Sequence, residues 1–296
     1  MRFSSIIYSI IILITVSACT EKFDNVKLVS NQDKLVIESF VNTQDTFSVR
    51  VTKTIEFGSD VENIAVSNLN IMIVENENDT ISLVETSQGN YTFNKYGVIG
   101  SSYYIIIEND DKVYASSPTV LEAPSILEAT TIKEFPNETG NGFYAFSCFA
   151  DDSTTQDYYL KSYNVYSKAT VNTIDSSKTI YYVEAFTDEF SNGFNTCEDD
   201  IEMDSVNIFS QVNSVPFSSE DTLMVFSLYR MNRFAYEYWS QFIEQTQFIG
   251  GPFDVPPSPI IGNIRNINDE NDYLLGYFMV AGMDRVTVEI SENYRL

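Results

Sequence analysis

Apolar and polar side chains alternate in short runs along most of the chain, a pattern that indicates β-strands with one buried face. In residues 46–54 (TFSVRVTKT), Phe47, Val49 and Val51 occupy every second position, with polar residues between them. Residues 69–74 (LNIMIV) show the same period of two. We therefore expect a chain built mainly from half-buried strands.

Turn-forming residues separate these runs. NEND (76–79), SQGN (87–90) and NDDK (109–112) each join two strand-like segments. Asn, Asp and Gly tolerate the left-handed backbone angles of hairpin turns. Short strands with frequent turns and no long helical stretch predict an immunoglobulin-like β-sandwich over residues 34–122. The proline-containing segment 121–125 (LEAPS) is the expected domain boundary.

The second half, residues 123–296, is also predicted to be a β-rich domain. Its strand-like segments are rich in β-branched and aromatic residues. They are residues 143–150, 157–168, 179–186, 222–230 and 284–290. The last of them is expected to form a closing hairpin with residues 273–281 (YLLGYFMVA).

One amphipathic helix is expected near residues 232–249 in this second domain. Apolar side chains recur there at helical spacing and form one stripe: Phe234, Ala235, Tyr238, Trp239, Phe242 and Ile243. Asn232 is the expected N-cap, and Gly250-Gly251-Pro252 would end the helix. We expect the stripe around Trp239 to face the protein core rather than a ligand.

The N-terminus has the pattern of a lipoprotein signal peptide over residues 1–18. An apolar segment, 6–16, follows Arg2 and is too short to span a bilayer. Val16-Ser17-Ala18-Cys19 then resembles a lipobox, in which small residues flank the cleavage site and the cysteine thiol takes a diacylglycerol. Cys19 is therefore the expected lipid attachment site, and the polar residues 19–33 a tether. The alternative is an ordinary signal peptide in which this cysteine is incidental.

Composition excludes several classes of function. The formal net charge is −25, so the chain would repel the phosphate backbone of nucleic acids. It contains no histidine, which excludes a Ser-His-Asp triad, a Cys-His dyad and a histidine-bearing zinc site. Chemistry with a carboxylate pair, as in glycosidases, remains open. A hydrophobic content of 44% indicates a folded protein.

Cys148 and Cys197 are the two cysteines that remain if Cys19 is acylated. An even pair in an oxidising export compartment can form a disulfide. The alternative is that Cys148, which lies between Phe146 and Phe149, is a buried thiol and that Cys197 is free. Sequence spacing does not decide between the two.

Acidic and proline-rich loops supply the candidate binding residues. CEDDIEMD offers enough carboxylate oxygens for a calcium ion, and its acidic residues are Glu198, Asp199, Asp200, Glu202 and Asp204. The alternative is a solvated loop that keeps the protein soluble. In GGPFDVPPSPIIGNI (250–264), four prolines stiffen a surface loop in which Phe253 and Ile260 offer apolar contacts to a partner. A loop that packs on its own domain is an equally good interpretation.

The order of several segments resembles a known family of Bacteroidota outer-membrane lipoproteins, domain of unknown function 4249. The segments are KLVIESFVNTQDTFSVRVTKT, VSNLNIMIVE, ETSQGNYTF, GSSYYIIIENDDKVYASS, DTLMVFSLYRMNRFAYEYWSQFIEQT, GGPFDVPPSPIIGNI and LLGYFMVAG. The aromatic helix followed by the proline-rich loop and LGYF carries most of the specificity. The resemblance implies a lipoprotein that accompanies a TonB-dependent outer-membrane receptor, and it brings no catalytic residues.

These observations together predict a non-catalytic lipoprotein that is an accessory or binding subunit of a TonB-dependent receptor in nutrient capture. No cofactor is expected apart from the calcium candidate. Glu21 and Asp24 vaguely resemble acidic surface-export signals, which favours the cell surface over the periplasmic face. A surface adhesin or structural module is one alternative, and a carbohydrate-active enzyme with paired carboxylates is the other.

Overall fold

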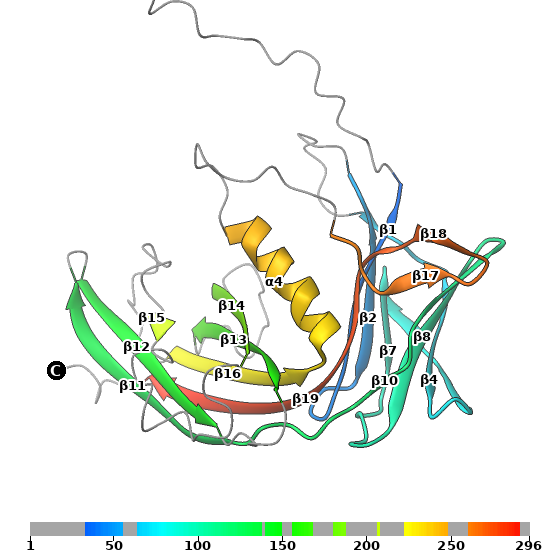
Figure 1. Cartoon of the computed structure of the whole chain (residues 1–296). Helices are drawn as coiled ribbons and strands as arrows, with labels where there is room; N and C mark the ends of the chain where they lie inside the picture. The colour runs from blue at the N-terminus through cyan, green and yellow to red at the C-terminus, as the bar shows by residue number, and fades with distance from the viewer. Residues whose placement is uncertain are drawn as a thin grey trace, which may run out of the picture. The chain divides into compact units, whose positions relative to one another are not determined.

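The computed structural model describes residues 33–55, 64–137, 140–149, 156–167, 180–187, 206–207, 222–247 and 260–290. Within these ranges the chain forms two large β-sheets, a small third sheet and one α-helix (Figure 1). The predicted fold class is confirmed, because the protein is mainly β, with sandwich-like sheets and a single described helix. That helix is not long and apolar enough to cross a membrane.

The first sheet has nine strands and contains the only parallel pair, β1 with β19, among the described strands. Its strand order is β14 (Ile180–Thr187), β13 (Tyr158–Ser167), β16 (Thr222–Met231), β19 (Leu275–Ile290), β1 (Leu35–Asn42), β2 (Phe47–Lys53), β7 (Asn90–Phe93) and β6 (Val84–Ser87), with β3 (Ile64–Ala65) beside β2.

The second sheet has seven strands, and all its described pairings are antiparallel. Its order is β18 (Asp269–Tyr273), β17 (Ile264–Asn266), β9 (Lys112–Ser116), β8 (Ser102–Asn109), β4 (Asn70–Glu75) and β5 (Asp79–Ser82), with β10 (Thr119–Val120) beside β8. The third sheet consists of β11 (Leu127–Asn137), β12 (Gly140–Phe149) and β15 (Val206–Asn207).

Strand pairing crosses the expected domain boundary at residue 122. β19 lies between β1 and β16 in the first sheet, and β17 pairs with β9 in the second. Strands from the last quarter of the chain therefore complete both sheets of the N-terminal sandwich.

The predicted closing hairpin is wrong, because residues 275–290 form one continuous strand, β19. Its first half pairs with β1 and its second half with β16, so both edges gain partners without a turn. Gly282 lies at the crossover, where a Cβ atom would come within 2.5 Å of the Glu122 carbonyl oxygen. The absence of a side chain lets the segment that leaves β10 pass directly over the strand.

The three hairpin turns expected from Asn, Asp and Gly are confirmed. Asn76 and Glu77, between β4 and β5, have positive φ angles of 49° and 65°. Gly89 (φ 72°) joins β6 to β7, and Asp110 (φ 52°) joins β8 to β9. These left-handed conformations are the ones that hairpin turns require.

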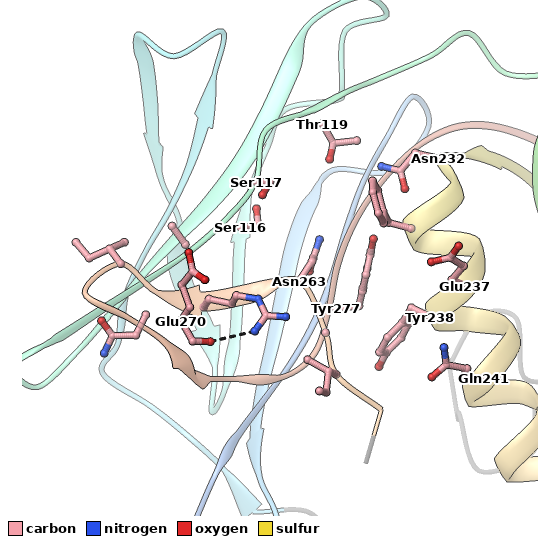
Figure 2. A pocket seen from close by; sticks show the side chains of 17 residues that line it. Ser116, Ser117, Thr119, Asn232, Glu237, Tyr238, Gln241, Asn263, Glu270 and Tyr277 are labelled. Carbon is pink, nitrogen blue, oxygen red and sulfur yellow. Dashed lines mark hydrogen bonds between the residues drawn. The ribbon is translucent and has the colours of Figure 1, made fainter. Parts of the chain in front are cut away.

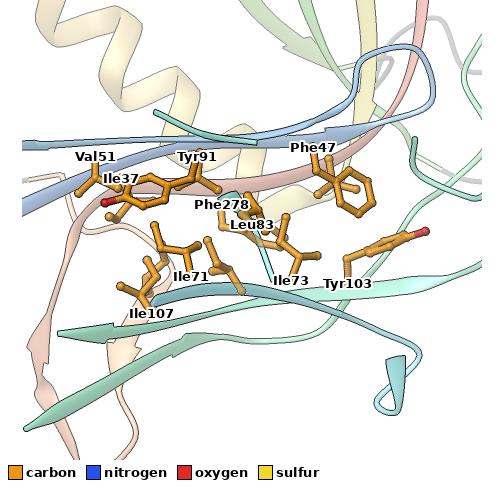
Figure 3. Packing of buried hydrophobic residues seen from close by; sticks show 14 of the residues in the cluster. Ile37, Phe47, Val51, Ile71, Ile73, Leu83, Tyr91, Tyr103, Ile107 and Phe278 are labelled. Carbon is orange, nitrogen blue, oxygen red and sulfur yellow. The ribbon is translucent and has the colours of Figure 1, made fainter. Parts of the chain in front are cut away.

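Alternate side chains of the first sheet belong to two hydrophobic cores, one on each face of the sheet. Ile37 and Phe278 point from the first sheet toward Ile71 of the second sheet (Figure 3), and all three side chains are at most 1% exposed. Met279, the next residue of β19, instead belongs to a cluster that packs against the helix α4 (Arg233–Gln247). The first sheet is thus covered by the second sheet on one face and by α4 on the other.

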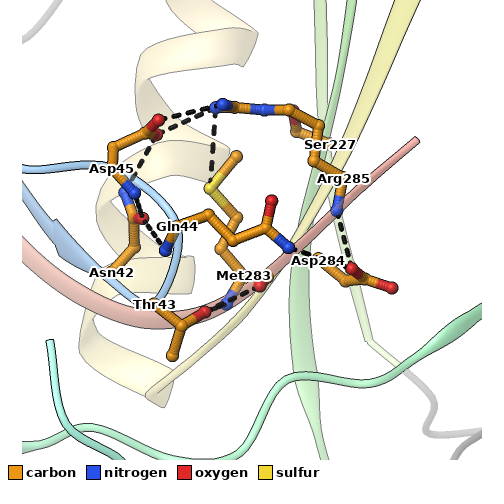
Figure 4. Close-up of polar contacts among 8 residues, drawn as sticks. All are labelled: Asn42, Thr43, Gln44, Asp45, Ser227, Met283, Asp284 and Arg285. Atoms are coloured by element: carbon orange, nitrogen blue, oxygen red, sulfur yellow. Dashed lines mark hydrogen bonds and ion pairs between the residues drawn. The ribbon is translucent and has the colours of Figure 1, made fainter. Parts of the chain in front are cut away.

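The turn between β1 and β2 is attached to β19 by polar contacts (Figure 4). The guanidinium of Arg285 donates to both carboxylate oxygens of Asp45, at 2.9 and 2.8 Å. The hydroxyl of Thr43 donates to the Met283 carbonyl oxygen at 2.7 Å and accepts from the Met283 amide at 3.1 Å. These contacts join residues 240 positions apart, and they reinforce the parallel pairing of β1 with β19.

Candidate functional site

A cavity of about 550 Å³ lies between α4 and the β17–β18 edge of the second sheet (Figure 2). One wall comes from α4 and its cap: Asn232, Phe234, Glu237, Tyr238 and Gln241. The facing wall comes from β9, β17, β18 and their flanks: Ala115, Ser116, Ser117, Thr119, Arg265, Asn266, Ile267 and Glu270. Ile261, Gly262, Asn263 and Tyr277 complete the lining. We call this cavity the α4–β17 groove. Its volume is within the usual range of small-molecule sites.

Two glycines bring the chain that enters β17 close to β19. A Cβ atom on Gly262 would be 1.7 Å from the carbonyl oxygen of Gly276, so no other residue fits there without movement. Gly276 itself has φ +83°, and a Cβ atom there would be 2.0 Å from the Ile37 carbonyl oxygen. The side chain of Asn263 then pairs with both backbone groups of Phe278, at 2.8 and 2.9 Å. This segment forms the base of the groove.

The position of α4 is set by its cap and its packing face. The side-chain oxygen of Asn232 accepts from the Ala235 amide at 2.8 Å, which confirms the predicted N-cap. Ala235 is 1% exposed, and the indole N–H of Trp239 donates to the Met279 sulfur at 3.1 Å. With this face against the first sheet, Phe234 and Tyr238 line the groove.

Two tyrosines that line the groove pack against each other, and of the two Tyr238 is half-buried and Tyr277 is buried, at 8% exposed. The ring centroids of Tyr238, from α4, and Tyr277, from β19, are 4.6 Å apart. Burial, with a smaller contribution from the Glu38 carboxylate, raises the pKa of Tyr238 to about 12. Burial, then Tyr238 and Glu237, raises the pKa of Tyr277 as well. Both hydroxyls therefore stay protonated at physiological pH, and neither has a hydrogen-bond partner within the part of the chain that the structure describes.

The polar side chains of the groove are only partly engaged. Glu237 accepts from Arg233 at 2.8 Å. Arg265 donates to the backbone carbonyl of Glu270 at 3.0 Å, as the dashed line in Figure 2 shows. Gln241 and Ser117 have no side-chain partner among the described residues, and they lie on opposite walls. The groove thus presents uncommitted donors and acceptors beside an aromatic surface.

A second cavity, of about 380 Å³, contains a hydrogen-bonded network centred on Asp272. Asp272 accepts from Lys112 at 2.8 Å, Tyr114 at 3.2 Å and Asn266 at 3.0 Å. The hydrogen bond from Lys112, followed by that from Asn266, holds the pKa of Asp272 below its ordinary value. We interpret this network as structural, since it attaches the β17–β18 hairpin to β9.

Comparison with known protein families identifies the family of this chain. A family model described as a domain of unknown function (DUF4249) matches residues 21–286, which is most of the chain. The chain belongs to the DUF4249 family. The match begins just after Cys19 and includes every residue that lines the α4–β17 groove. No curated protein matches this DUF4249 chain.

Most site residues predicted from the sequence fall outside the residues that the structure describes in this DUF4249 chain. These are Cys19, Cys197, Phe253 and the calcium candidates Glu198, Asp199, Asp200, Glu202 and Asp204. Cys148 lies in β12, where only its backbone is described, so the disulfide stays a prediction. Ile260 is half-buried, and its neighbour Ile261 lines the groove. The described residues hold no cluster of three or more acidic or cysteine side chains suited to a metal ion.

Sequence reasoning missed the groove of this DUF4249 domain. The helical stripe was expected to face the core, and Ala235, Tyr238, Trp239 and Ile243 do pack in the core cluster. Phe234 and Phe242 do not, since they are 73% and 40% exposed. The first sheet covers the face of α4 that carries Ala235 and Trp239. The apolar stripe extends beyond this covered face. An apolar stripe too wide to be covered by packing on one sheet is the sequence feature that could have indicated a binding face.

Proposed function

We propose that the protein is a non-catalytic outer-membrane lipoprotein that captures a small ligand in the α4–β17 groove as the accessory subunit of a TonB-dependent receptor. The observation that carries the proposal is the groove itself. It combines the paired rings of Tyr238 and Tyr277 with side chains on both walls that have no partner among the described residues. Grooves of this kind bind ligands by packing on aromatic rings and orient them with a few polar groups.

The expected lipid anchor at Cys19 supports the proposed association with a TonB-dependent receptor. Cys19 follows a lipobox-like pattern, and the segment 19–33, fully extended, would span at most about 50 Å. A protein held within that distance of the membrane meets a receptor in the same membrane at a high effective concentration, on the order of millimolar for short tethers. Modest affinity between the two proteins would then be enough for a lasting association.

An enzyme is the second candidate, because two carboxylates line opposite walls of the groove. They belong to Glu237 on α4 and Glu270 on β18. Paired carboxylates across a cleft perform glycoside hydrolysis, but the general acid is normally shielded in an apolar pocket. The side chain of Glu237 is 45% exposed and forms an ion pair with Arg233 at 2.8 Å. This environment favours a binding role over acid catalysis.

Co-purification tests the proposed function. The tagged, full-length lipoprotein is extracted from native outer membranes in mild detergent, and the proteins that accompany it are quantified by mass spectrometry. A Cys19→Ala variant, which cannot be lipidated, is the matched control. We expect a TonB-dependent receptor in near-equal amount with the lipidated protein and far less with the control. Recovery of the lipoprotein alone would contradict the accessory role.

A further inference from the structure

We infer that the α4–β17 groove recognises a short oligosaccharide that is uncharged or cationic. This inference rests on the proposed capture of a ligand and adds the chemical class of that ligand. It is carried by the aromatic surface, by the mixture of hydrogen-bonding groups and by the charges of the groove.

The aromatic surface suits the faces of sugar rings. Tyr277 is only 8% exposed and supports the ring of Tyr238, which lies 4.6 Å away at an interplanar angle of 32°. The half-buried Tyr238 and the exposed Phe234 are therefore the rings that a sugar can reach. A sugar ring has an apolar C–H face, which packs on the electron-rich face of an aromatic ring. Phe234, which is 73% exposed at the rim, offers a further ring at the same opening.

The hydrogen-bonding groups suit hydroxyls. The side chains of Ser117, Thr119 and Gln241 can both donate and accept, and none has a partner among the described residues. The two tyrosine hydroxyls are likewise uncommitted and stay protonated. A ligand rich in hydroxyl groups satisfies such a set, because each hydroxyl is also both donor and acceptor. An apolar ligand of the same size would leave these groups without hydrogen bonds once water was displaced.

The charges of the groove disfavour an acidic sugar. Glu237 and Glu270 contribute two carboxylates, whereas Arg265 is the one basic side chain among the described residues that line the groove. The whole chain carries a formal net charge of −25, which adds a repulsive background for anions. Uronic acids and sulfated sugars would therefore bind more weakly than neutral sugars, and amino sugars would bind at least as well.

The single tryptophan of the chain makes binding measurable. Trp239 follows Tyr238 on α4, and their rings meet edge to face with centroids 5.9 Å apart. A sugar that packs on Tyr238 changes the surroundings of the indole, so intrinsic fluorescence reports occupancy. Isothermal titration calorimetry gives an independent dissociation constant.

The test titrates the full mature chain with cellotriose, maltotriose, chitotriose, the glucosamine trimer and trigalacturonate. We expect saturable binding of at least one neutral or cationic trimer and at least tenfold weaker binding of trigalacturonate. Phe234→Ala should raise the dissociation constant of the bound trimer about tenfold, because an anchoring ring is lost. Gln241→Ala should raise it about fivefold, since it removes one or two hydrogen bonds. Gln88→Ala, at an exposed turn away from the groove, is the matched control and should change nothing.

Two results would overturn the inference. One is that no neutral or cationic trimer binds at about 10 mM, a concentration that would largely fill a site with a dissociation constant of about 1 mM. The other is binding that Phe234→Ala and Gln241→Ala leave unchanged, which would place the sugar elsewhere. Both side chains are exposed, so the variants should fold normally, and their thermal unfolding is measured to verify this. If the receptor co-purifies but no sugar binds, only the proposed ligand class is contradicted. If a sugar binds but no receptor co-purifies, only the proposed accessory role is contradicted.

Discussion

Replacement of Glu75 by Gln tests how a buried carboxylate stabilises the second sheet. Glu75, at the end of β4, is 5% exposed and accepts hydrogen bonds from the Lys95 ammonium and, at 2.7 Å, from the Tyr103 hydroxyl. Burial alone would raise the pKa of Glu75. The hydrogen bonds from Lys95 and Tyr103, together with the charge of Lys95, outweigh that effect and hold the pKa below its ordinary value.

The expected loss of stability follows from these two contacts. A hydrogen bond to a charged group contributes about 1.5–3 kcal/mol, and one between neutral groups about 0.5–1.5 kcal/mol. Glutamine has nearly the same shape and still accepts through its amide oxygen, so each contact weakens by about 1 kcal/mol. The free energy of unfolding at pH 7 should therefore fall by about 2 kcal/mol. Lys95 remains one-third exposed, so water partly compensates for its lost partner.

The stabilisation by Glu75 should depend on pH. Because the pKa of Glu75 is lower in the folded state, the stabilisation is complete above the unfolded-state pKa of about 4.3. It is lost as the pH falls through the lowered folded-state pKa. Urea unfolding of wild type and Glu75→Gln should thus differ by about 2 kcal/mol at pH 7, and the difference should shrink progressively as the pH falls below about 4.3. Glu77→Gln, at the exposed turn beside it, should match wild type throughout. Equal stability of wild type and Glu75→Gln at pH 7, or a difference that grows as the pH is lowered, would refute the reasoning.

Three further changes probe other parts of the structure. Asn232→Ala should lower the free energy of unfolding by about 1 kcal/mol, measured in urea, because it removes the N-cap of α4. Gly262→Ala should destabilise the protein by more than about 2 kcal/mol in the same assay and weaken ligand binding, since its Cβ atom would collide with the Gly276 carbonyl oxygen. A double-mutant cycle with Asp45→Ala and Arg285→Ala should give a coupling free energy of about 1 kcal/mol that decreases at high salt, as expected for a bidentate but partly exposed pair. Full additivity of the two substitutions would show that this ion pair does not stabilise the fold.

Local chemistry made much of the fold predictable. The hairpin turns at residues 76–79, 87–90 and 109–112 depend on residues that tolerate positive φ, and each turn lies within the sequence that specifies it. The cap at Asn232 is equally local, because donor and acceptor are three residues apart. Strand periodicity likewise identified the main strands, since alternation is a property of each strand by itself.

Long-range pairing was not predictable in the same way. β1 and β19 are more than 200 residues apart, and nothing in either strand specifies the other as its parallel partner. The continuous course of β19 also depends on Gly282, whose small size matters only because residues 122–124 pass over it. These features depend on contacts between distant segments, which periodicity does not encode.

The α4–β17 groove was not predictable either, because segments that are distant in the sequence form it. Its lining comes from residues 115–119, 232–241 and 261–277, which converge only after both sheets have formed. Tyr277 alternates like any strand residue, and its proximity to Tyr238 depends on where α4 lies on the first sheet. The width of the apolar stripe on α4 was the one sequence feature that could have indicated a ligand, and it was assigned to the core instead.

Retention of small molecules by the wild-type protein and by Phe234→Ala tests the central claim most directly. Both full-length proteins are equilibrated by dialysis with small molecules extracted from the native growth medium, and the retained compounds are identified by mass spectrometry before and after incubation. A compound that wild type retains unchanged and that Phe234→Ala releases is the result that capture in the α4–β17 groove predicts. Identical retention by both proteins, or chemical conversion of the retained compound, would contradict a non-catalytic binding site in this groove.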